Sequence, residues 1–311
     1  MRGAGTGCRV AEPSAGPDPC APARRLRELL TAPELLVAPG VFDGLSARVA
    51  EQAGFAAVYL SGGAVARSSG VPDLGLLSMT EVLVRVREVV DAVGVPVLAD
   101  ADTGYGGVLN VRRTVLEMQR LGVAGLHLED QVTPKKCGHY SAKALVSTDE
   151  MVGKLEAALD ARTDPDLVLV ARTDAVAVEG VDAALARARR YAEAGADAVF
   201  VEAPESREQM QRIVQEVQVP LVVNMFAGGR TPYLPAGELE EMGFAMALVP
   251  SDLQRAAVHA MQRAARALYD EGWTASMADD MVDFSTRDAL VGLADLQAVA
   301  DRFEPGRGSP A

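Results

Sequence analysis

The 311-residue sequence has few cysteines and few lysines, and both shortages exclude classes of protein. Only three cysteines occur, and two of them, Cys8 and Cys20, lie in a Gly/Pro/Ala-rich start of low complexity. Cys137 alone falls in the region expected to fold, which excludes a disulfide framework, and no paired Cys/His spacing indicates structural zinc. We therefore expect a cytoplasmic protein.

Long apolar runs and an excess of basic residues are also missing. No apolar run approaches the roughly 18 residues of a membrane span, so we expect no membrane partner. Lys and Arg number 30 against 43 Asp and Glu, a net charge of −13, which argues against a nucleic-acid partner because phosphate binding needs clustered cations. The first 25 residues lack the apolar stretch of a signal peptide. We expect residues 1–24 to be disordered and residues 304–311 to form a flexible tail.

A repeat organises the rest of the chain. In residues 53–60, 121–128, 194–201 and 242–249, a glycine follows an amphipathic Arg/Glu-rich stretch and a short apolar run follows the glycine. Such a glycine adopts the left-handed conformation and ends a helix, after which a buried strand begins two or three residues later.

Other apolar runs lie between these copies, at 35–39, 95–102, 167–174 and 219–225. Continuous Val/Leu runs are typical of parallel strands covered by helices. Together the two sets give eight β–α units in about 230 residues, which predicts a (β/α)8 TIM barrel, one domain over residues 25–303. The alternative, an open doubly wound sheet, lacks its Gly-x-Gly-x-x-Gly phosphate turn here.

Helices are expected on both sides of the barrel. A helix over 25–33 leads into the first strand, and helices over 253–271, 281–293 and 294–303 follow the eighth strand, with a break at Gly272-Trp273. A barrel does not need the last helices. They must therefore cover either the flank of this barrel or a neighbouring subunit.

Polar residues gather where the predicted strands end, which is where reactive groups collect in this fold. Asp100 and Asp102 end the third strand, and their spacing directs both to one side, while Glu129 ends the fourth. Three convergent carboxylates require a cation, and all-oxygen ligation suits Mg2+. The alternative is that they cap helix N-termini or pair with arginines: Arg112, Arg113 and Arg172.

Anion-binding groups end other strands. Arg172 at the fifth strand end can clamp a carboxylate through its planar guanidinium, and it can also pair internally with Glu202 or Asp174. Ser61 and the two glycines after it offer a hydroxyl and backbone N–H groups to an oxyanion.

Cys137 lies in the loop after the fourth strand, preceded by Lys135 and Lys136 and followed by Gly138 and His139. A thiol flanked by cations should have a lowered pKa and can transfer protons near neutrality. Its alternative role as a small buried apolar side chain fits charged neighbours poorly. No lysine lies on a predicted strand, which disfavours a Schiff-base aldolase, and the scattered histidines disfavour a zinc hydrolase.

Taken together, these motifs resemble the isocitrate lyase/phosphoenolpyruvate mutase superfamily over residues 25–303. The segments that carry the resemblance are 59–63, 72–75, 100–106, 128–131, 135–139 and 171–174. The resemblance implies a TIM barrel whose C-terminal helix is exchanged between subunits, in a homo-oligomer that is usually a dimer of dimers.

The resemblance also implies a site. Mg2+, with Mn2+ as a substitute, would be held near Asp100, Asp102 and Glu129, largely through water. A 2-oxo acid would place its carboxylate on Ser61, Gly62 and Gly63, with Asp73 close by. Cys137 would be the catalytic acid/base. The other catalytic or lining residues would be Lys135, Gly138, His139, Arg172, Glu202 and Asn224.

The implied reaction is a retro-aldol cleavage of a 2-hydroxy di- or tricarboxylate, with Cys137 protonating the departing carbanion. Residues 170–180 most resemble the methylisocitrate lyase branch, which implies pyruvate and succinate as products. Residues 224–232 are more similar to the dimethylmalate lyase and carboxyphosphonoenolpyruvate mutase branches, although Ala227 replaces their acidic residue. P–C bond chemistry, decarboxylation and a non-catalytic binding protein are the alternatives.

Overall fold

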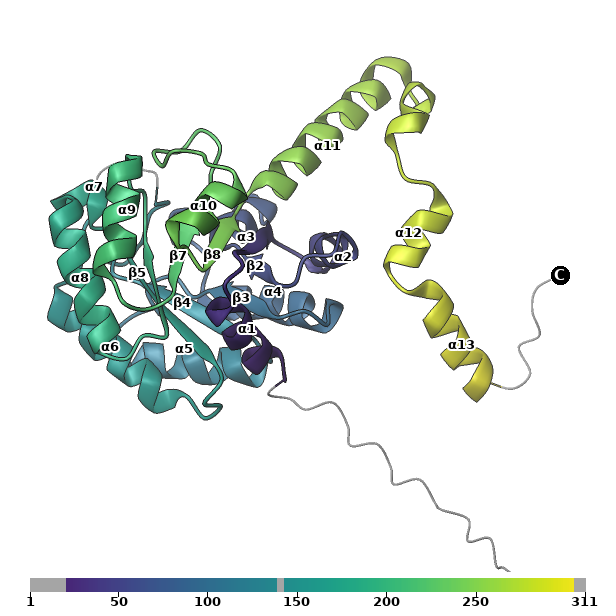
Figure 1. Ribbon diagram of the computed structural model, residues 1–311. Helices are drawn as coiled ribbons and strands as arrows, with labels where there is room; N and C mark the ends of the chain where they lie inside the picture. The colour runs from purple at the N-terminus through teal and green to yellow at the C-terminus, as the bar shows by residue number, and fades with distance from the viewer. Residues whose placement is uncertain (1–20, 139–142, 305–311) are drawn as a thin grey trace, which may run out of the picture.

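Eight parallel strands close into one barrel in the order β1 to β8 in the computed structural model, which describes residues 21–138 and 143–304 (Figure 1). The strands are β1 Leu36–Val41, β2 Val58–Leu60, β3 Val97–Asp100, β4 Gly125–Glu129, β5 Val168–Thr173, β6 Ala198–Val201, β7 Leu221–Asn224 and β8 Met246–Val249. The predicted (β/α)8 barrel is confirmed, and the open sheet is excluded because β1 pairs with both β2 and β8.

Helices surround the barrel and continue beyond it. They are α1 Ala21–Thr31, α2 Gly44–Gln52, α3 Gly62–Ser68, α4 Met79–Ala92, α5 Val108–Arg120, α6 Thr148–Ala161, α7 Val176–Glu179, α8 Val181–Glu193, α9 Arg207–Glu216, α10 Ala236–Met242, α11 Asp252–Glu271, the 3-10 helix η1 Ala275–Asp280, α12 Phe284–Leu290 and α13 Leu293–Phe303.

The glycines of the sequence repeat end helices as predicted. Gly54, Gly122, Gly195 and Gly243 have φ of 94°, 88°, 103° and 100°, the left-handed region that glycine enters without a steric penalty. A strand begins three or four residues after each of them. The repeat therefore marks the ends of the helices that precede the even-numbered strands β2, β4, β6 and β8.

Helix α1 closes the amino-terminal end of the barrel. Leu26 is fully buried and Leu30 is 5% exposed, in one cluster with interior residues such as Val168. The helix starts at Ala21, so the boundary expected after residue 24 falls inside it, and residues 1–20 lie outside the described chain.

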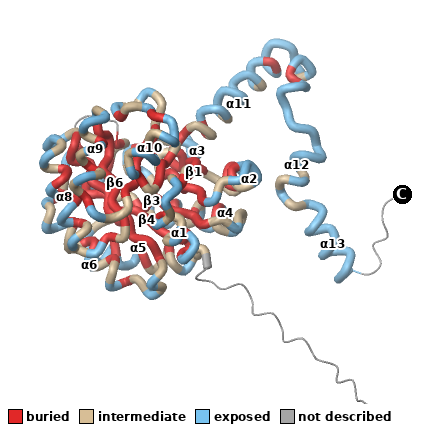
Figure 2. The backbone as a smooth tube through the Cα atoms, in the orientation of Figure 1, coloured by how far each residue is buried: buried red, intermediate tan, exposed pale blue. Residues whose placement is uncertain are grey.

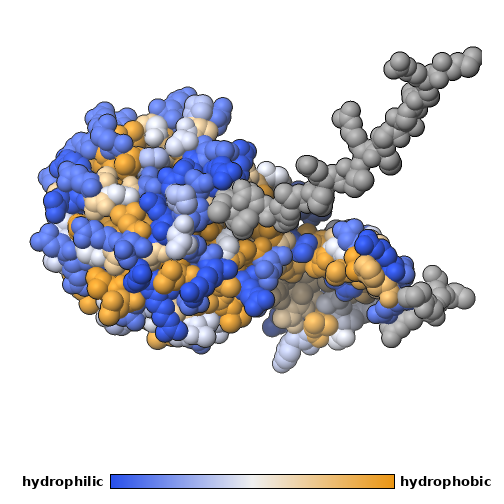
Figure 3. Space-filling model, turned by 90° about the horizontal axis from the view of Figure 1, so that it is seen from below, coloured by the Kyte–Doolittle hydropathy of each residue, from blue (hydrophilic) through white to orange (hydrophobic). Residues whose placement is uncertain are grey.

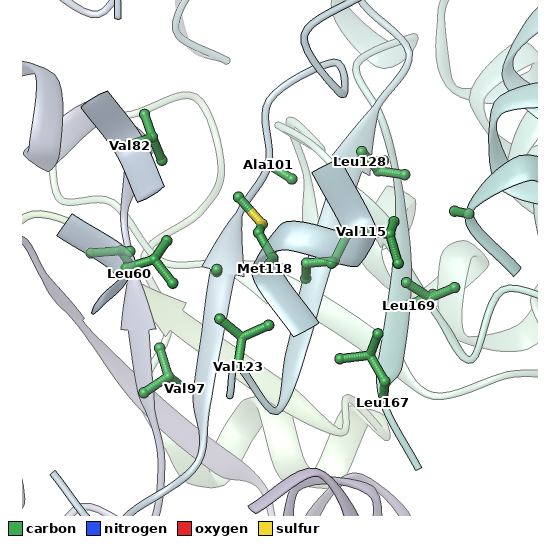
Figure 4. Packing of buried hydrophobic residues seen from close by; sticks show 14 of the residues in the cluster. Leu60, Val82, Val97, Ala101, Val115, Met118, Val123, Leu128, Leu167 and Leu169 are labelled. Atoms are coloured by element: carbon green, nitrogen blue, oxygen red, sulfur yellow. The ribbon is translucent and has the colours of Figure 1, made fainter. Parts of the chain in front are cut away.

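A second apolar layer lies between the strands and the outer helices. Figure 4 shows Val115 and Met118 of α5 among Ala101, Leu128 and Leu169 of the barrel wall. Met118 is fully buried, and burying a side chain of this size contributes about 1.5–3 kcal/mol. Apolar cover on both sides of the strands explains their continuous Val/Leu sequences.

The segment after β8 forms an arm that leaves the barrel (Figures 1 and 2). Helix α11 confirms the predicted helix over 253–271, and Gly272 breaks it with a φ of 76°. The 3-10 helix η1 was not predicted, and α12 is shorter than expected. Helix α12 contacts α2 of its own barrel, but neither α12 nor α13 has a buried residue, so the arm leaves most of its surface uncovered.

Large apolar side chains of the arm are exposed, and hydrophobic surface is visible on it at the right of Figure 3. They are Met261, Leu268, Tyr269, Trp273, Met281, Val282, Phe284, Val291, Leu293, Leu296, Val299 and Phe303. Exposed apolar side chains in such number on one segment indicate an interaction surface. None of the helices in the described ranges combines the length and apolarity needed to cross a bilayer.

Candidate active site

A cavity opens at the carboxyl ends of the strands and gathers most of the predicted site residues. Its lining residues are Tyr59, Ser61, Gly63, Arg67, Asp73, Asp100, Lys135, Cys137, Gly138, Arg172, Glu202, Asn224, Phe226, Pro250 and Ser251. Gly62 and Asp102 line a smaller adjoining cavity, and Glu129 contacts Arg172. His139 lies outside the described residues. The other predicted residues therefore converge on one place from segments far apart in the sequence.

Asp100 is the last residue of β3 and is held by several donors. Its Oδ2 accepts hydrogen bonds from the Tyr59 hydroxyl at 3.3 Å and from the Gly62 N–H at 3.2 Å. Its Oδ1 accepts from the Asp102 N–H at 2.9 Å. Burial raises the pKa of this carboxyl, but His127, Lys135 and Arg172 outweigh burial and hold it below its ordinary value. Asp100 is therefore a fixed anion, and the Gly62 N–H expected to serve substrate is already engaged.

His127 supports Asp100 from within the barrel. The imidazole is fully buried. Its Nε2 lies 2.9 Å from the Tyr59 hydroxyl and 3.4 Å from Asp100 Oδ1. Burial lowers the pKa of His127 to about 4, so the ring is neutral at physiological pH.

Asp102 lies beyond the strand on which it was expected, although it lines the smaller cavity together with Asp100. Strand β3 ends at Asp100, and Asp102 has a φ of 48° in the turn that follows, so alternation along a strand does not set its direction. Lys135 Nζ lies 2.9 Å from Asp102 Oδ1 and 2.6 Å from Asp73 Oδ1. Burial raises the pKa of Asp102 to about 6, although Lys135 lowers it. Lys135 thus bridges the Asp73 and Asp102 carboxylates in the cavity lining.

Arg172, at the end of β5, contacts three carboxylates. Its Nε and Nη2 donate to Asp174 at 2.9 and 3.2 Å, Nε lies 3.3 Å from Glu129 Oε2, and Nη2 lies 3.6 Å from Glu202 Oε2. The internal ion pairs considered for Arg172 are therefore present. Burial raises the pKa of Glu129 well above its ordinary value, and its Oε1 is buried without a hydrogen-bond partner.

Cys137 enters the cavity on a loop held against these groups. The Gln131 side chain accepts from the Lys136 N–H at 3.0 Å and donates to the Lys136 carbonyl at 2.8 Å. Gly138 packs so closely that a Cβ there would lie 2.6 Å from Arg172 Nη2 and 2.7 Å from Glu202 Cδ. The half-buried Cys137 therefore faces the cavity from a backbone that is held on both sides of it.

The charge balance of the site fits a divalent cation. In the part of the site that the structure describes, six largely buried carboxyl groups (Asp73, Asp100, Asp102, Glu129, Asp174, Glu202) lie around three buried basic groups (Lys135, Lys143, Arg172), which leaves acidic groups in excess. A metal would relieve that excess, and all-oxygen donors suit Mg2+. No three His, Cys, Asp or Glu residues of the described chain are arranged as direct ligands, because Asp102 turns to Lys135 and Glu129 to Arg172. The residues fit an ion held largely through water.

Several lining residues were not predicted. Arg67 lies four residues after Gly63, one helical turn along α3, so helical spacing could have indicated it. Pro250 and Ser251 follow β8, and neither carries a charge that could have indicated it. Nothing in the sequence indicated that Lys143 belongs to the site, because its contacts with Gly138 and Asp174 form only in the folded chain.

A closed (β/α)8 barrel with charged side chains converging at its carboxyl end defines an enzyme architecture. The family model described as phosphoenolpyruvate phosphomutase matches residues 26–269. The chain is 46% identical over 286 residues to the 2,3-dimethylmalate lyase of Eubacterium barkeri, covering 92% of this chain and 99% of that one. It is 44% identical over 268 residues to the 2-methylisocitrate lyase of Bacillus subtilis, covering 86% and 87%.

Solved structures similar to this chain are also of enzymes with small acids as ligands. Oxaloacetate acetylhydrolase in complex with 3,3-difluorooxalacetate has a TM-score of 0.88 at 35% identity, covering 93% of this chain and 99% of that one. A phosphonopyruvate hydrolase complex with oxalate and Mg2+ has a TM-score of 0.83 at 29% identity, covering 90% and 98%. The chain belongs to the phosphoenolpyruvate mutase/isocitrate lyase superfamily, and it is an enzyme that acts on small acids.

Proposed function

We propose that this protein is a Mg2+-dependent carbon–carbon lyase that cleaves a 2-hydroxy acid by a retro-aldol reaction and releases a 2-oxo acid such as pyruvate. The observation that carries the proposal is the position of Cys137. Its loop brings a proton-transferring side chain into a cavity that also holds Arg172 and the Asp100 carboxylate. Acid/base, cationic and metal-compatible groups at one point are the requirements of this chemistry.

Different residues of this chain bind, orient and enclose the substrate. Ser61 and Gly63 bind the carboxylate of the 2-oxo acid unit, while the Gly62 N–H holds Asp100. Asn224, whose Oδ1 is buried without a hydrogen-bond partner, orients the other half of the substrate. Asp100, Asp102 and Glu129 would hold Mg2+, largely through water, and the ion would supply electrostatic stabilisation of negative charge on the substrate oxygen. Arg172 and Glu202 fix the wall against which Gly138 packs.

Proton transfer completes the reaction. The hydroxyl proton passes to a carboxylate of the site as the C–C bond breaks. The electron pair of that bond remains on the departing carbon, and the Cys137 thiol donates its proton there. The packed loop excludes water from the carbanion.

Two substrates are considered. 2-Methylisocitrate follows from the resemblance of residues 170–180 and from the Bacillus subtilis relative. 2,3-Dimethylmalate is the second candidate, favoured by Phe226 and Pro250 in the cavity lining, because apolar walls suit methyl groups better than a third carboxylate.

A coupled lactate dehydrogenase assay tests the proposal. Purified enzyme with Mg2+ is given 2-methylisocitrate, 2,3-dimethylmalate, isocitrate and oxaloacetate, and pyruvate release is followed. We expect turnover of one of the first two. No turnover of either one refutes the proposal, and a phosphonate substrate would then be tested for P–C bond chemistry.

The arm after β8 is proposed to pack on a second copy of this chain, in a homo-oligomer. Its exposed apolar residues, from Met261 to Phe303, contribute a surface that permanent dimers bury. Truncation after Gly272 removes η1, α12 and α13. We expect the truncated chain to sediment as a smaller species than the full chain, and an unchanged oligomer would contradict the proposal.

A further inference from the structure

Lys143 is a buried cation outside the set of residues to which the proposed function assigns a role. Its side chain is 1% exposed, and its Nζ donates to the Gly138 carbonyl at 2.5 Å and to Asp174 Oδ1 at 2.7 Å. Taking an ammonium group out of water is costly unless it is paired. The two contacts therefore account for the presence of this charge inside the protein.

One end of this connection is rigid. The Asp174 carboxylate is completely buried and also receives both Arg172 hydrogen bonds, so Lys143 and Arg172 share it. The Asp174 N–H donates to Asp130 Oδ1 at 2.9 Å, which fixes the chain after β5. Asp174 is consequently a fixed point for anything that Lys143 holds.

The other end is the peptide unit that follows Cys137. Gly138 packs against Arg172 and Glu202 closely enough to exclude a Cβ. Gln131 holds the residue before Cys137 through Lys136, and Lys143 holds the residue after it. Cys137 therefore lies between two anchored residues. Lys143 links Gly138 to Asp174, Asp174 binds Arg172, and Arg172 packs against Gly138.

We propose that Lys143 is a positioning residue that anchors the Cys137 loop in the active site by tying the Gly138 carbonyl to Asp174. Its effect on turnover rests on the proposed lyase function, but its effect on the thiol does not. Without the ammonium group, Gly138 loses its tie to Asp174, and Cys137 leaves its place in the cavity lining.

The first measurement is alkylation of Cys137 by iodoacetamide without substrate, followed by mass spectrometry of the peptide and normalised to Cys8 and Cys20. Lys143→Met should raise the rate about tenfold or more, the factor lost with one hydrogen bond to a charged group. Lys143→Arg, which keeps the charge, should raise it less. Lys154→Met is the matched control, because Lys154 is 3% exposed and its Nζ donates to the Thr103 carbonyl at 3.2 Å.

The control should alkylate at the wild-type rate. A folded Lys143→Met protein with wild-type alkylation overturns the proposal. Equal acceleration in Lys154→Met also overturns it, because the effect would then be a general loosening. If Lys143→Met does not fold, Lys143→Gln is used instead, because the shorter neutral glutamine side chain cannot bond both the Gly138 carbonyl and Asp174. The same alkylation results then support or overturn the proposal.

Turnover provides the second readout. Lys143→Met should lower kcat about 10- to 100-fold with a smaller change in KM, because the loop supplies the proton after substrate binds. Lys143→Arg should recover part of kcat. A change in KM alone overturns the positioning role. If the wild type cleaves none of the tested acids, the lyase proposal fails while the alkylation rates still decide the role of Lys143.

Discussion

Gly138→Ala is the substitution whose effect the structure defines most closely. The added methyl would lie 2.6 Å from Arg172 Nη2 and 2.7 Å from Glu202 Cδ, whereas unstrained contacts between such atoms are about 3.5–4.0 Å. Either the Cys137 loop or the wall must move by about 1 Å. Glu202 is 1% exposed and Arg172 is held by Asp174, so the loop moves.

A misplacement of about 1 Å at a catalytic group can cost about 100-fold in rate, or about 2.7 kcal/mol in transition-state energy. We expect kcat/KM of Gly138→Ala to fall by about that factor, measured by pyruvate release, with only a small change in melting temperature, because the barrel core is untouched. Gly237→Ala is the control, since nothing lies within 4 Å of its Cβ position. A Gly138→Ala enzyme within twofold of wild type would refute the packing argument.

Three further predictions follow from the structure. Cys137→Ser should lower kcat by orders of magnitude while pyruvate still binds, as measured by calorimetry, and a fully active variant would remove the thiol from the mechanism. Chelation with EDTA should abolish pyruvate release and Mg2+ should restore it, whereas activity that survives exhaustive chelation would exclude the metal. Tyr191→Phe removes the 2.9 Å hydrogen bond to buried Asp130 and should lower the free energy of unfolding by about 1–3 kcal/mol in urea, while an unchanged midpoint would show that the bond contributes nothing.

The barrel could be predicted because its signals are local. A glycine that must adopt positive φ, as at Gly54 or Gly195, is visible in the sequence together with the helix before it and the strand after it. The start of α1 was missed because its first residues share the Ala/Pro composition of the segment before them, although Pro22 at a helix start is itself a signal.

The site could be predicted only as a list of strand ends. Barrel topology brings those ends together, so Asp100, Arg172 and Glu202 were found without knowledge of any contact. The pairing of Lys135 with Asp73 and Asp102 spans distant segments, and Asp102 lies in a left-handed turn where strand alternation does not set its direction. Such contacts depend on the folded chain and leave no pattern in the sequence.

Cleavage in D2O, followed by proton NMR, tests the central claim most directly. With Mg2+ and 2-methylisocitrate or 2,3-dimethylmalate, the account predicts one pyruvate and one deuterium in the other product for each turnover, because an exchanged Cys137 thiol delivers the deuteron to the carbanion. Failure of both acids to yield pyruvate, or a second product without deuterium, would contradict it.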